Sequence, residues 1–356
     1  MSRVPSLVAL GTLSPLLLYS LLAAGPVEVE RTLYLMGTRA TLAVHAPDRV
    51  AALNQLDRMV RRLEQSEATL STWRENTELG RLNRQPVGDP FEVGQDVCAL
   101  WAILTRWHVE TDGAFDPAVG ALIEAWGLRD GGRRPSEAEL LTARAVSGFH
   151  HFAFNSETGA CRVTRLADVT LDAGAFGKGE ALRRLQADGE SNFPWWVDLG
   201  GQVAVSAATR HSEGWPFAIA DPARRSQPAM DIVLIEGSLA TSGASERSFS
   251  VDGERIAHIL DPRSGDALYR PESVTVWHQD PLVADLLSTA LYVLGPEDGV
   301  HFAEARDLAA LFLAPSTEAT GNGLTARATV AFERRFPRAT EQVNDRLGMP
   351  VQRGPN

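Results

Sequence analysis

The predicted helices and strands of this chain do not alternate regularly, and this irregular order limits the folds open to it. Apolar residues such as Val50, Leu53 and Leu56 recur every three or four positions over Arg49–Leu70, as in an amphipathic helix, and Val93–Thr111, Pro135–Ala145 and Pro281–Leu294 are also predicted to be helical. Short runs typical of β-strands cover residues 31–45, 149–154, 161–164, 195–198, 217–220, 231–234, 273–277 and 309–313. A parallel sheet would need a regular strand–helix–strand repeat. We therefore expect an α+β fold in which mixed or antiparallel sheets pack with helices.

Two of these helices carry clear end signals. Ser136 followed by Glu139 forms the pattern of a capping box at the start of the third helix. Asp280 is placed to cap the fourth helix, Pro281 suits its first turn, and Gly295 is expected to end it.

The first 26 residues differ from the rest of the chain. Leu7–Ala24 carries no charge and follows Arg3, which is typical of a secretory signal peptide or an uncleaved N-terminal membrane anchor. Pro15 would kink a spanning helix, and small residues at positions 23–25 suit cleavage. A buried core helix is the alternative. We expect export across the inner membrane, with the remaining chain in the periplasm.

Charge and cysteine content exclude some classes of protein. The 34 Lys and Arg against 45 Asp and Glu give a net charge of −11, which argues against a protein that coats nucleic acid. Two cysteines are too few for a disulfide scaffold and lack zinc-site spacing. A bridge between Cys98 and Cys161 is chemically allowed after export, but the spacing alone does not establish it.

Two glycine-containing segments could approach a ligand closely. In GAFDPAVGALIEAWG, residues 113–127, Asp116 before a proline can cap a following helix, although an ordinary turn would look the same. In LDAGAFGKGEA, residues 171–181, three glycines surround Lys178. Glycines permit close backbone approach to a phosphate, and the lysine supplies a positive charge. A structural turn is the alternative for this loop.

Two further places carry groups suited to chemistry. His258 lies just before an Asp-Pro pair, and a histidine with a reference pKa of about 6.5 can exchange protons near neutrality. Asp285 and Thr289 lie four residues apart and so share one helix face among apolar neighbours. Hard oxygen ligands of this kind suit Mg²⁺. The alternatives are a structural histidine and a solvated aspartate whose threonine neighbour bonds back to the helix.

Taken in order, these motifs resemble the ApbE family, the FAD:protein FMN transferases. The resemblance runs from Met36 to about Gly295. It rests on MGT at 36–38, STWRENTELGRLN at 71–83, the two glycine segments, VDLGG at 197–201, TSG at 241–243, HILDP at 258–262 and the Asp285/Thr289 helix.

The resemblance implies an enzyme with its site between two subdomains of an ApbE-like domain spanning 27–333, followed by a peripheral tail, 334–356. Such an enzyme uses Mg²⁺, splits FAD and attaches FMN as a phosphoester to a threonine of an exported flavoprotein, releasing AMP. The acceptor is typically a subunit of a membrane redox complex. Carried over to this sequence, the metal ligands are the Gly177 main-chain carbonyl, Asp285 and Thr289, and His258 is the base. The implied flavin contacts are Met36, Trp73, Ala114, Phe115, Asp116, Glu180 and Ile259.

This chain departs from the family pattern at three places. Trp73 and Ser245 each stand where relatives commonly have tyrosine, and Gly177 stands where alanine is common. Two other functions fit the same motifs: a periplasmic pyrophosphatase that cuts FAD to FMN and AMP, and a non-catalytic flavin-binding maturation factor.

Overall fold

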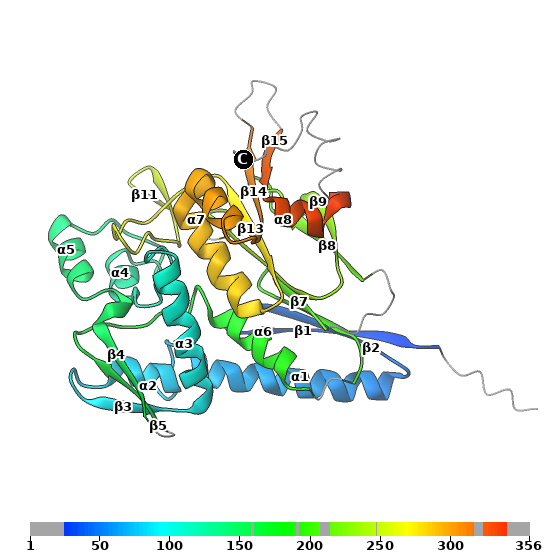
Figure 1. Cartoon of the computed structure of the whole chain (residues 1–356), viewed down its shortest axis with the longest axis horizontal. Coiled ribbons are helices and arrows are strands. Elements are labelled where there is room, and N and C mark those ends of the chain that lie inside the picture. The colour runs from blue at the N-terminus through cyan, green and yellow to red at the C-terminus, as the bar shows by residue number, and fades with distance from the viewer. Residues whose placement is uncertain are drawn as a thin grey trace, which may run out of the picture.

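An eight-stranded sheet runs through the molecule, and several helices pack on it (Figure 1). The computed structural model describes residues 25–157, 160–189, 192–206, 214–246, 248–316 and 323–339. Each pair of neighbouring strands in the sheet is antiparallel. The spatial order of the strands is β1 (Val27–Leu35), β2 (Thr38–Ala46), β6 (Trp195–Leu199), β7 (Gln202–Val205), β10 (Gly237–Gly243), β13 (Ser273–His278), β14 (Ala309–Pro315) and β15 (Leu324–Ala328).

The first predicted strand is in fact a hairpin. Residues 31–45 were expected to form one strand, but the chain reverses at Met36 and Gly37, whose φ values are 52° and 74°. Two consecutive residues with positive φ give the tight turn that suits the twist of antiparallel strands. The alternating pattern continues through the turn, so periodicity alone did not reveal it. The turn places Met36 at one end of the sheet.

The predicted first helix is confirmed as α1, Arg49–Leu70. The Asp48 carboxylate accepts a hydrogen bond from the Ala51 amide at 2.9 Å and so caps its start. The helix packs on β1, β2 and α6 (Gly177–Ala187), and Leu56 and Leu63 are fully buried in this core. Val50 belongs to the predicted apolar stripe but is exposed.

A smaller body lies at the left of Figure 1. A three-stranded antiparallel sheet in the order β3–β5–β4 forms its base. Ser136 and Glu139 form the predicted capping box at the start of α5. The elements of this body are α2 (Glu78–Arg84), β3 (Pro90–Val93), α3 (Gln95–Glu110), α4 (Gly120–Ala125), α5 (Glu137–Ala145), the short 3₁₀ helix η1 (Phe149–His151), β4 (Phe152–Glu157) and β5 (Ala160–Arg165).

A disulfide ties this smaller body together. Cys98 on α3 bonds to Cys161 on β5, with their Cα atoms 5.8 Å apart. The bridge that the sequence allowed but did not establish is therefore present in the structure.

Reduction of this bridge is expected to destabilise the protein. The bridge joins residues 63 positions apart, and closing a loop of that size stabilises the folded state by up to about 4 kcal/mol in the chain-entropy model. Denaturant unfolding with and without a reducing agent measures the difference. A Cys98→Ser/Cys161→Ser variant is the control, because its stability should not respond to the reductant. If the reductant lowered the free energy of unfolding of that variant by the same amount, the effect could not come from the Cys98–Cys161 bridge.

Helix α7, Pro281–Glu304, lies against β10, β13 and α6 (Figure 1). The Asp280 carboxylate accepts from the Leu282 amide at 2.9 Å, as predicted for a cap. The expected end at Gly295 is a sharp kink instead, with φ 83° and ψ 177°, after which the helix continues from Pro296. Proline at the first turn of the continued segment explains why it can resume there.

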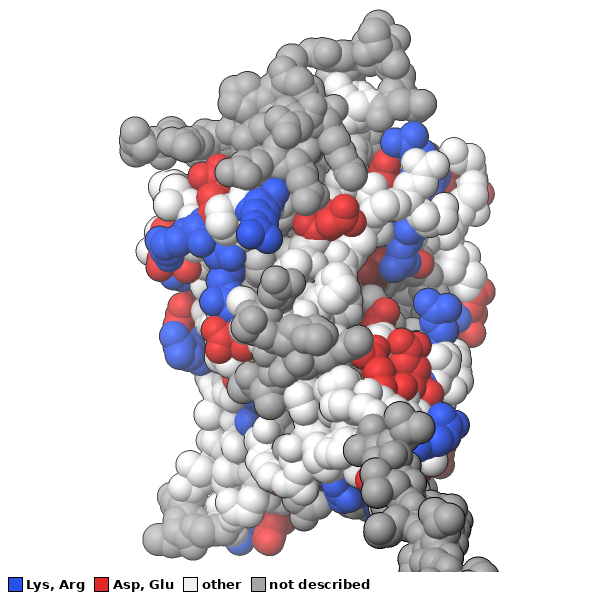
Figure 2. Space-filling view, turned by 90° about the vertical axis from the view of Figure 1, so that its right-hand side faces the viewer, with Lys and Arg blue, Asp and Glu red and all other residues white. Residues whose placement is uncertain are grey.

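The remaining elements form smaller units. The hairpin of β8 (Trp215–Ala220) and β9 (Pro228–Leu234) is separate from the main sheet, as is that of β11 (Ser248–Val251) and β12 (Glu254–Ala257). Helix α8, Val330–Arg335, follows β15. On the face drawn in Figure 2, basic and acidic side chains lie interspersed among uncharged residues.

The folded body extends further towards the C-terminus than the sequence predicts. A tail was expected from residue 334, but Phe336 and Ala339 are buried in the core beneath β14 and β15, so residues 334–339 belong to the folded body. Residues 340–356 and the apolar segment of residues 1–24 lie outside the described residues. Within the described ranges, no helix has the length and apolar character needed to cross a bilayer.

Candidate active site

An open cavity brings together residues from segments far apart in the sequence. We call it the central cavity. Its walls come from the smaller body, the loop before α6, the loop after β12 and helix α7. The predicted site residues that line it are Trp73, Ala114, Phe115, Asp116, His258, Ile259, Asp285 and Thr289.

Two other predicted residues line an adjoining cavity. Met36 from the β1–β2 turn and Gly177 from the start of α6 lie there. Trp73, Gly174 and Lys178 line both cavities, so the two spaces meet at the glycine loop. The structure thus gathers these residues around one loop without placing Gly177 in the same cavity as Asp285.

Glu180 is the exception among the predicted flavin contacts. Its side chain is fully buried, and its carboxylate pairs with Arg183 at 2.6 Å and with Arg184 at 2.7 Å. It lines none of the described cavities around the glycine loop. A direct contact between the Glu180 carboxylate and a flavin is therefore not supported by this structure, which gives the group a role within α6.

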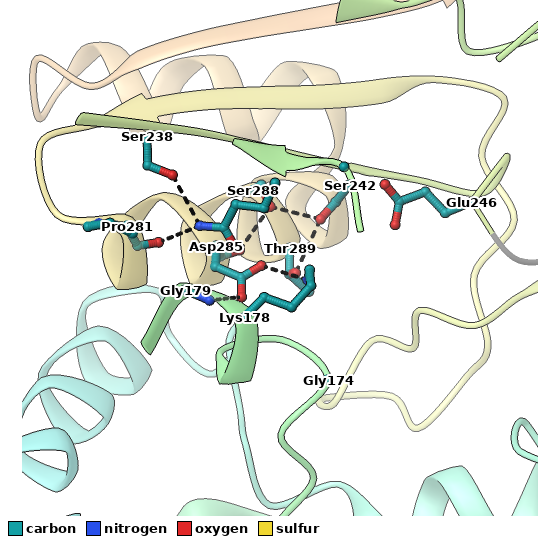
Figure 3. Close-up of polar contacts among 12 residues, drawn as sticks. Gly174, Lys178, Gly179, Ser238, Ser242, Glu246, Pro281, Asp285, Ser288 and Thr289 are labelled. Carbon is teal, nitrogen blue, oxygen red and sulfur yellow. Dashed lines mark hydrogen bonds and ion pairs between the residues drawn. The ribbon is translucent and has the colours of Figure 1, made fainter. Parts of the chain in front are cut away.

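Helices α6 and α7 meet at Asp285 (Figure 3). Its carboxylate accepts from the Gly179 amide at 2.8 Å and from the Lys178 ammonium at 3.1 Å, and its side chain is only 4% exposed. The amide comes from the first turn of α6, where unpaired N–H groups favour negative charge. The buried carboxylate is thus held by an amide and an ammonium group at the edge of the cavity.

Gly179 allows this close approach because it has no Cβ. A Cβ there would lie 2.6 Å from the Asp285 Cβ, 2.6 Å from the Pro281 carbonyl oxygen and 2.8 Å from the Leu282 Cα. Two of these atoms belong to the backbone and the Asp285 Cβ is bonded directly to it, so the helices would have to separate. These packing distances alone explain why position 179 requires a glycine.

Gly179→Ala is therefore expected to destabilise the protein by about 1–3 kcal/mol, the usual cost of overpacking. It should also weaken the bond from residue 179 to Asp285, and so lower activity. Gly25→Ala, at a position where a Cβ meets nothing within 4 Å and φ lies outside the left-handed region, is the control for a glycine-to-alanine change without overpacking. Thermal unfolding of both variants measures the difference. A Gly179→Ala protein as stable as wild type would contradict the packing argument.

Lys178 and Glu246 add a second pair of charges beside Asp285. Burial lowers the pKa of Lys178, but the negative charges of Asp285 and Glu246 outweigh this effect, so that its pKa is raised and the ammonium form is kept. Burial raises the pKa of Glu246, against the opposing effects of Lys178 and Arg225. Lys178 and Glu246 line the central cavity. The glycine loop made Lys178 a candidate ligand-binding residue in the sequence. No motif predicted that Glu246 would lie beside this lysine.

A row of hydroxyl groups holds Thr289 in place (Figure 3). The Ser242 hydroxyl lies 2.8 Å from that of Ser288 and 3.2 Å from that of Thr289. The Ser288 hydroxyl in turn donates to the Asp285 carbonyl oxygen at 2.8 Å. Ser242 comes from β10 and the others from α7, so the hydroxyl row links the sheet to the helix. Ser242 lies within the TSG motif, although its role as a link appears only in the structure.

The oxygen atoms of this cluster fit a magnesium ion that also binds substrate. Asp285 and Thr289 offer a carboxylate and a hydroxyl to the same cavity, and each carboxylate oxygen can accept more than one partner. Among the described residues, no group of three or more His, Cys, Asp or Glu side chains could hold a metal alone. Mg²⁺ characteristically takes one or two carboxylates and completes its shell with water and substrate phosphates. The donor set fits such an ion rather than a metal held only by protein.

Asp116 supports the wall of the cavity and does not cap α4. Its carboxylate accepts from the Ala118 amide at 2.7 Å and the Phe149 amide at 3.0 Å. Helix α4 itself begins at Gly120, with Val119 as its N-cap. Burial raises the pKa of Asp116, although His108, 3.4 Å away, and both amides act in the opposite direction. The carboxylate therefore fixes the loop that carries Ala114 and Phe115.

Trp73 lies at the mouth of the cavity and is 59% exposed. The Arg129 guanidinium stacks over its ring at 4.3 Å, and Arg129 also donates to the Asp172 carboxylate at 2.7 Å. A flat ring of this kind suits stacking on a ligand ring. Arg129 covers one face of Trp73, a contact that no sequence motif predicted.

His258 lies where two cavities meet. It lines the central cavity and also a third, outer cavity that contains Arg39, Asp198 and Arg225. Lys178 and Glu246 line the same two spaces. A base at this position can be reached from the central cavity on one side and from the outer cavity on the other.

Known proteins match this chain over most of its length. The model of the ApbE family matches residues 36–312. An FAD:protein FMN transferase of Vibrio cholerae is 31% identical over 265 residues, covering 73% of this chain and 78% of that protein. One of Treponema pallidum is 31% identical over 291 residues, covering 76% and 80% respectively.

Solved structures agree with the sequence matches. The flavinyl transferase ApbE of Pseudomonas stutzeri, in its apo form, superposes with a TM-score of 0.73 at 28% identity, covering 87% of this chain and 97% of that one. The flavin transferase ApbE of Vibrio cholerae gives 0.75 at 26% identity, covering 87% and 99%. These matches confirm the expected fold, and the predicted resemblance is confirmed with it. The chain belongs to the ApbE family.

Proposed function

We propose that this chain is an Mg²⁺-dependent FAD:protein FMN transferase that modifies a threonine of an exported flavoprotein and releases AMP. The relatives named as FAD:protein FMN transferases support the activity. The observation that carries the proposal is the central cavity, where the candidate base His258 shares one space with Asp285, Thr289 and the predicted flavin contacts.

The central cavity has the surfaces that an FAD molecule needs. Phe115, Ile259 and the exposed Trp73 offer apolar and aromatic surface for a ring system. Lys178 offers positive charge for a pyrophosphate. With a net charge of −11 on the chain, local groups such as Lys178 must supply the attraction for the anionic ligand.

The transfer itself exchanges one phosphorus–oxygen bond for another. The acceptor threonine oxygen bonds to the FMN phosphorus of FAD while the bond to the bridging pyrophosphate oxygen breaks, and AMP leaves with that oxygen. His258 takes the proton from the threonine hydroxyl, which is otherwise a poor nucleophile. Lys178 stabilises the charge that grows on the phosphate oxygens.

Mg²⁺, when bound, neutralises charge on the pyrophosphate and makes AMP a better leaving group. Asp285 and Thr289 would hold it, with the Gly177 carbonyl as the third ligand that the family resemblance implies. Lys178 and Gly179 keep the Asp285 carboxylate at the edge of the cavity.

Incubation of the purified protein with FAD, Mg²⁺ and a candidate acceptor flavoprotein tests the proposal. Mass spectrometry should find the mass of FMN added to one acceptor threonine, together with one AMP per modified chain. Free FMN and AMP without a modified acceptor would instead indicate a pyrophosphatase. FAD binding without either product would indicate a non-catalytic flavin-binding protein.

We also propose that the enzyme acts in the periplasm, exported or held at the inner membrane by residues 1–26. The uncharged Leu7–Ala24 segment after Arg3 supports this. A periplasmic site suits an acceptor that is a subunit of a membrane redox complex. Fractionation of cells producing the full chain should place it in the periplasm or the inner membrane, whereas a cytosolic chain would contradict the proposal.

A further inference from the structure

A further cavity adjoins the site and has no role in the scheme above. It lies between the β8–β9 hairpin and strands β10 and β13. We call it the hairpin cavity. Phe217, Ile219 and Ile232 line it from the hairpin, and Thr241, Ser273 and Thr275 line it from the sheet.

The hairpin cavity adjoins both spaces at the reacting centre. Thr241 and Glu246 line it and the central cavity alike. Asp198, Gly201 and Arg225 line it together with the outer cavity on which His258 lies. A ligand that fills the hairpin cavity can therefore extend to His258 without passing through the space proposed for FAD.

The hairpin cavity contains a buried hydroxyl that no described residue satisfies. Ser273 is 4% exposed, and its Oγ has no hydrogen-bond partner among the described residues. Thr241 and Thr275, by contrast, bond to each other at 2.9 Å. A buried hydroxyl without a partner is costly, and such groups in native proteins usually meet a water or a ligand.

The packing around Ser273 keeps space at this hydroxyl. Gly243 is its cross-strand partner, and a Cβ there would lie 3.2 Å from the Ser273 Cβ. Ser245, which stands where relatives commonly have tyrosine, contributes only a small side chain to the same cavity. Small residues at both positions leave the cavity open beside an unsatisfied hydrogen-bonding group.

These features suit a polypeptide better than a flavin. Aliphatic and aromatic side chains lie beside hydroxyl groups, and Arg225 lies at the rim with Asp198 and Glu246. An extended peptide presents alternating side chains together with main-chain N–H and C=O groups. The apolar residues can receive one of its side chains, and Ser273 can bond to its main chain.

We propose that the hairpin cavity binds the acceptor polypeptide next to the threonine that receives FMN. This inference rests on the proposed function and adds a binding site for its protein substrate. The peptide lies between the β8–β9 hairpin and the sheet, bonds to Ser273, and passes along the outer cavity so that its threonine reaches His258.

Acceptor kinetics test this site. A decapeptide library with a central threonine and random flanking residues is first incubated with wild type, FAD and Mg²⁺, and a labelled peptide is chosen by mass spectrometry. Ser245→Trp, which fills the cavity, should raise the KM for this peptide at least about tenfold, with kcat changed less than about twofold. Ser273→Ala should raise the KM about fivefold. The Kd for FAD should stay at the wild-type value in both variants.

Val233→Trp is the matched control, because it adds the same side chain to the exposed neighbour of Ile232 on β9. It should leave both the KM for the peptide and the Kd for FAD unchanged. Weaker FAD binding in Ser245→Trp or Ser273→Ala would assign the cavity to the flavin and overturn the inference. Unchanged peptide KM in both variants would also overturn it, while transfer by wild type would leave the proposed function standing. A wild type that labels no peptide but still modifies an acceptor flavoprotein would overturn this inference alone, whereas one that modifies neither would contradict the proposed function as well.

Discussion

His258→Ala is expected to lower the rate of FMN transfer about 10²–10⁴-fold, the usual contribution of a general base. The affinity for FAD should change little, because the apolar and aromatic surface for the ring system comes from other residues. Transfer assays at saturating FAD and isothermal titration with FAD measure the two effects separately. The expected pattern is a fall in kcat with nearly constant Kd.

His301→Ala is the control for this experiment, since His301 is exposed near the end of α7. It should transfer FMN at the wild-type rate. The pH profile gives a second readout: wild-type activity should fall on the acidic side as the base takes up a proton, and the residual activity of His258→Ala should lack that limb. Wild-type rates in His258→Ala would remove this residue from the mechanism and favour a flavin-binding protein without catalysis.

Asp285→Asn is expected to lower transfer about 10³-fold, which corresponds to about 4 kcal/mol of transition-state stabilisation. Asparagine has the same size and can still accept a hydrogen bond from the Gly179 amide, so we expect the fold to persist. It lacks the negative charge that a divalent cation requires, and it leaves the Lys178 ammonium without its nearest counter-charge. The concentration of Mg²⁺ needed for half-maximal activity should rise at least about tenfold.

Asp280→Asn is the matched control on the same helix. Asp280 caps α7 through the Leu282 amide and does not line the central cavity. Asparagine caps a helix about as well as aspartate, so stability and Mg²⁺ requirement should both stay near wild type. If Asp285→Asn kept the wild-type Mg²⁺ requirement and rate, the metal site would have to lie elsewhere.

Several local features could be predicted from the sequence because they depend on neighbouring residues. Helix α1 and the capping box of α5 follow from periodicity and from residue types a few positions apart. The cap of α7 by Asp280 follows in the same way. The turn at Met36 was missed because alternation does not stop there, and the continuation of α7 was missed because a glycine followed by proline usually ends a helix.

The candidate site could be predicted in its residue types but not in its contacts. The motifs named Asp285, Thr289 and His258, and the structure brings these three to one cavity. The motifs also named Glu180, whose carboxylate is in fact buried against two arginines of its own helix. Sequence gave no sign that Arg129 would cover Trp73, because the two residues are neighbours only through the fold.

The sequence by itself determined the helices with clear periodicity or end signals, such as α1 and α5, and the residue types that could carry chemistry. The tertiary structure alone decided which of these segments meet. Gly179 and Asp285 are 106 residues apart, and Cys98 and Cys161 are separated by 63, yet each pair is in direct contact. Local patterns record only the interactions of near neighbours along the chain, whereas such distant contacts are set by how the sheet and helices pack as a whole. The same packing leaves the Ser273 hydroxyl buried in the hairpin cavity without a described partner.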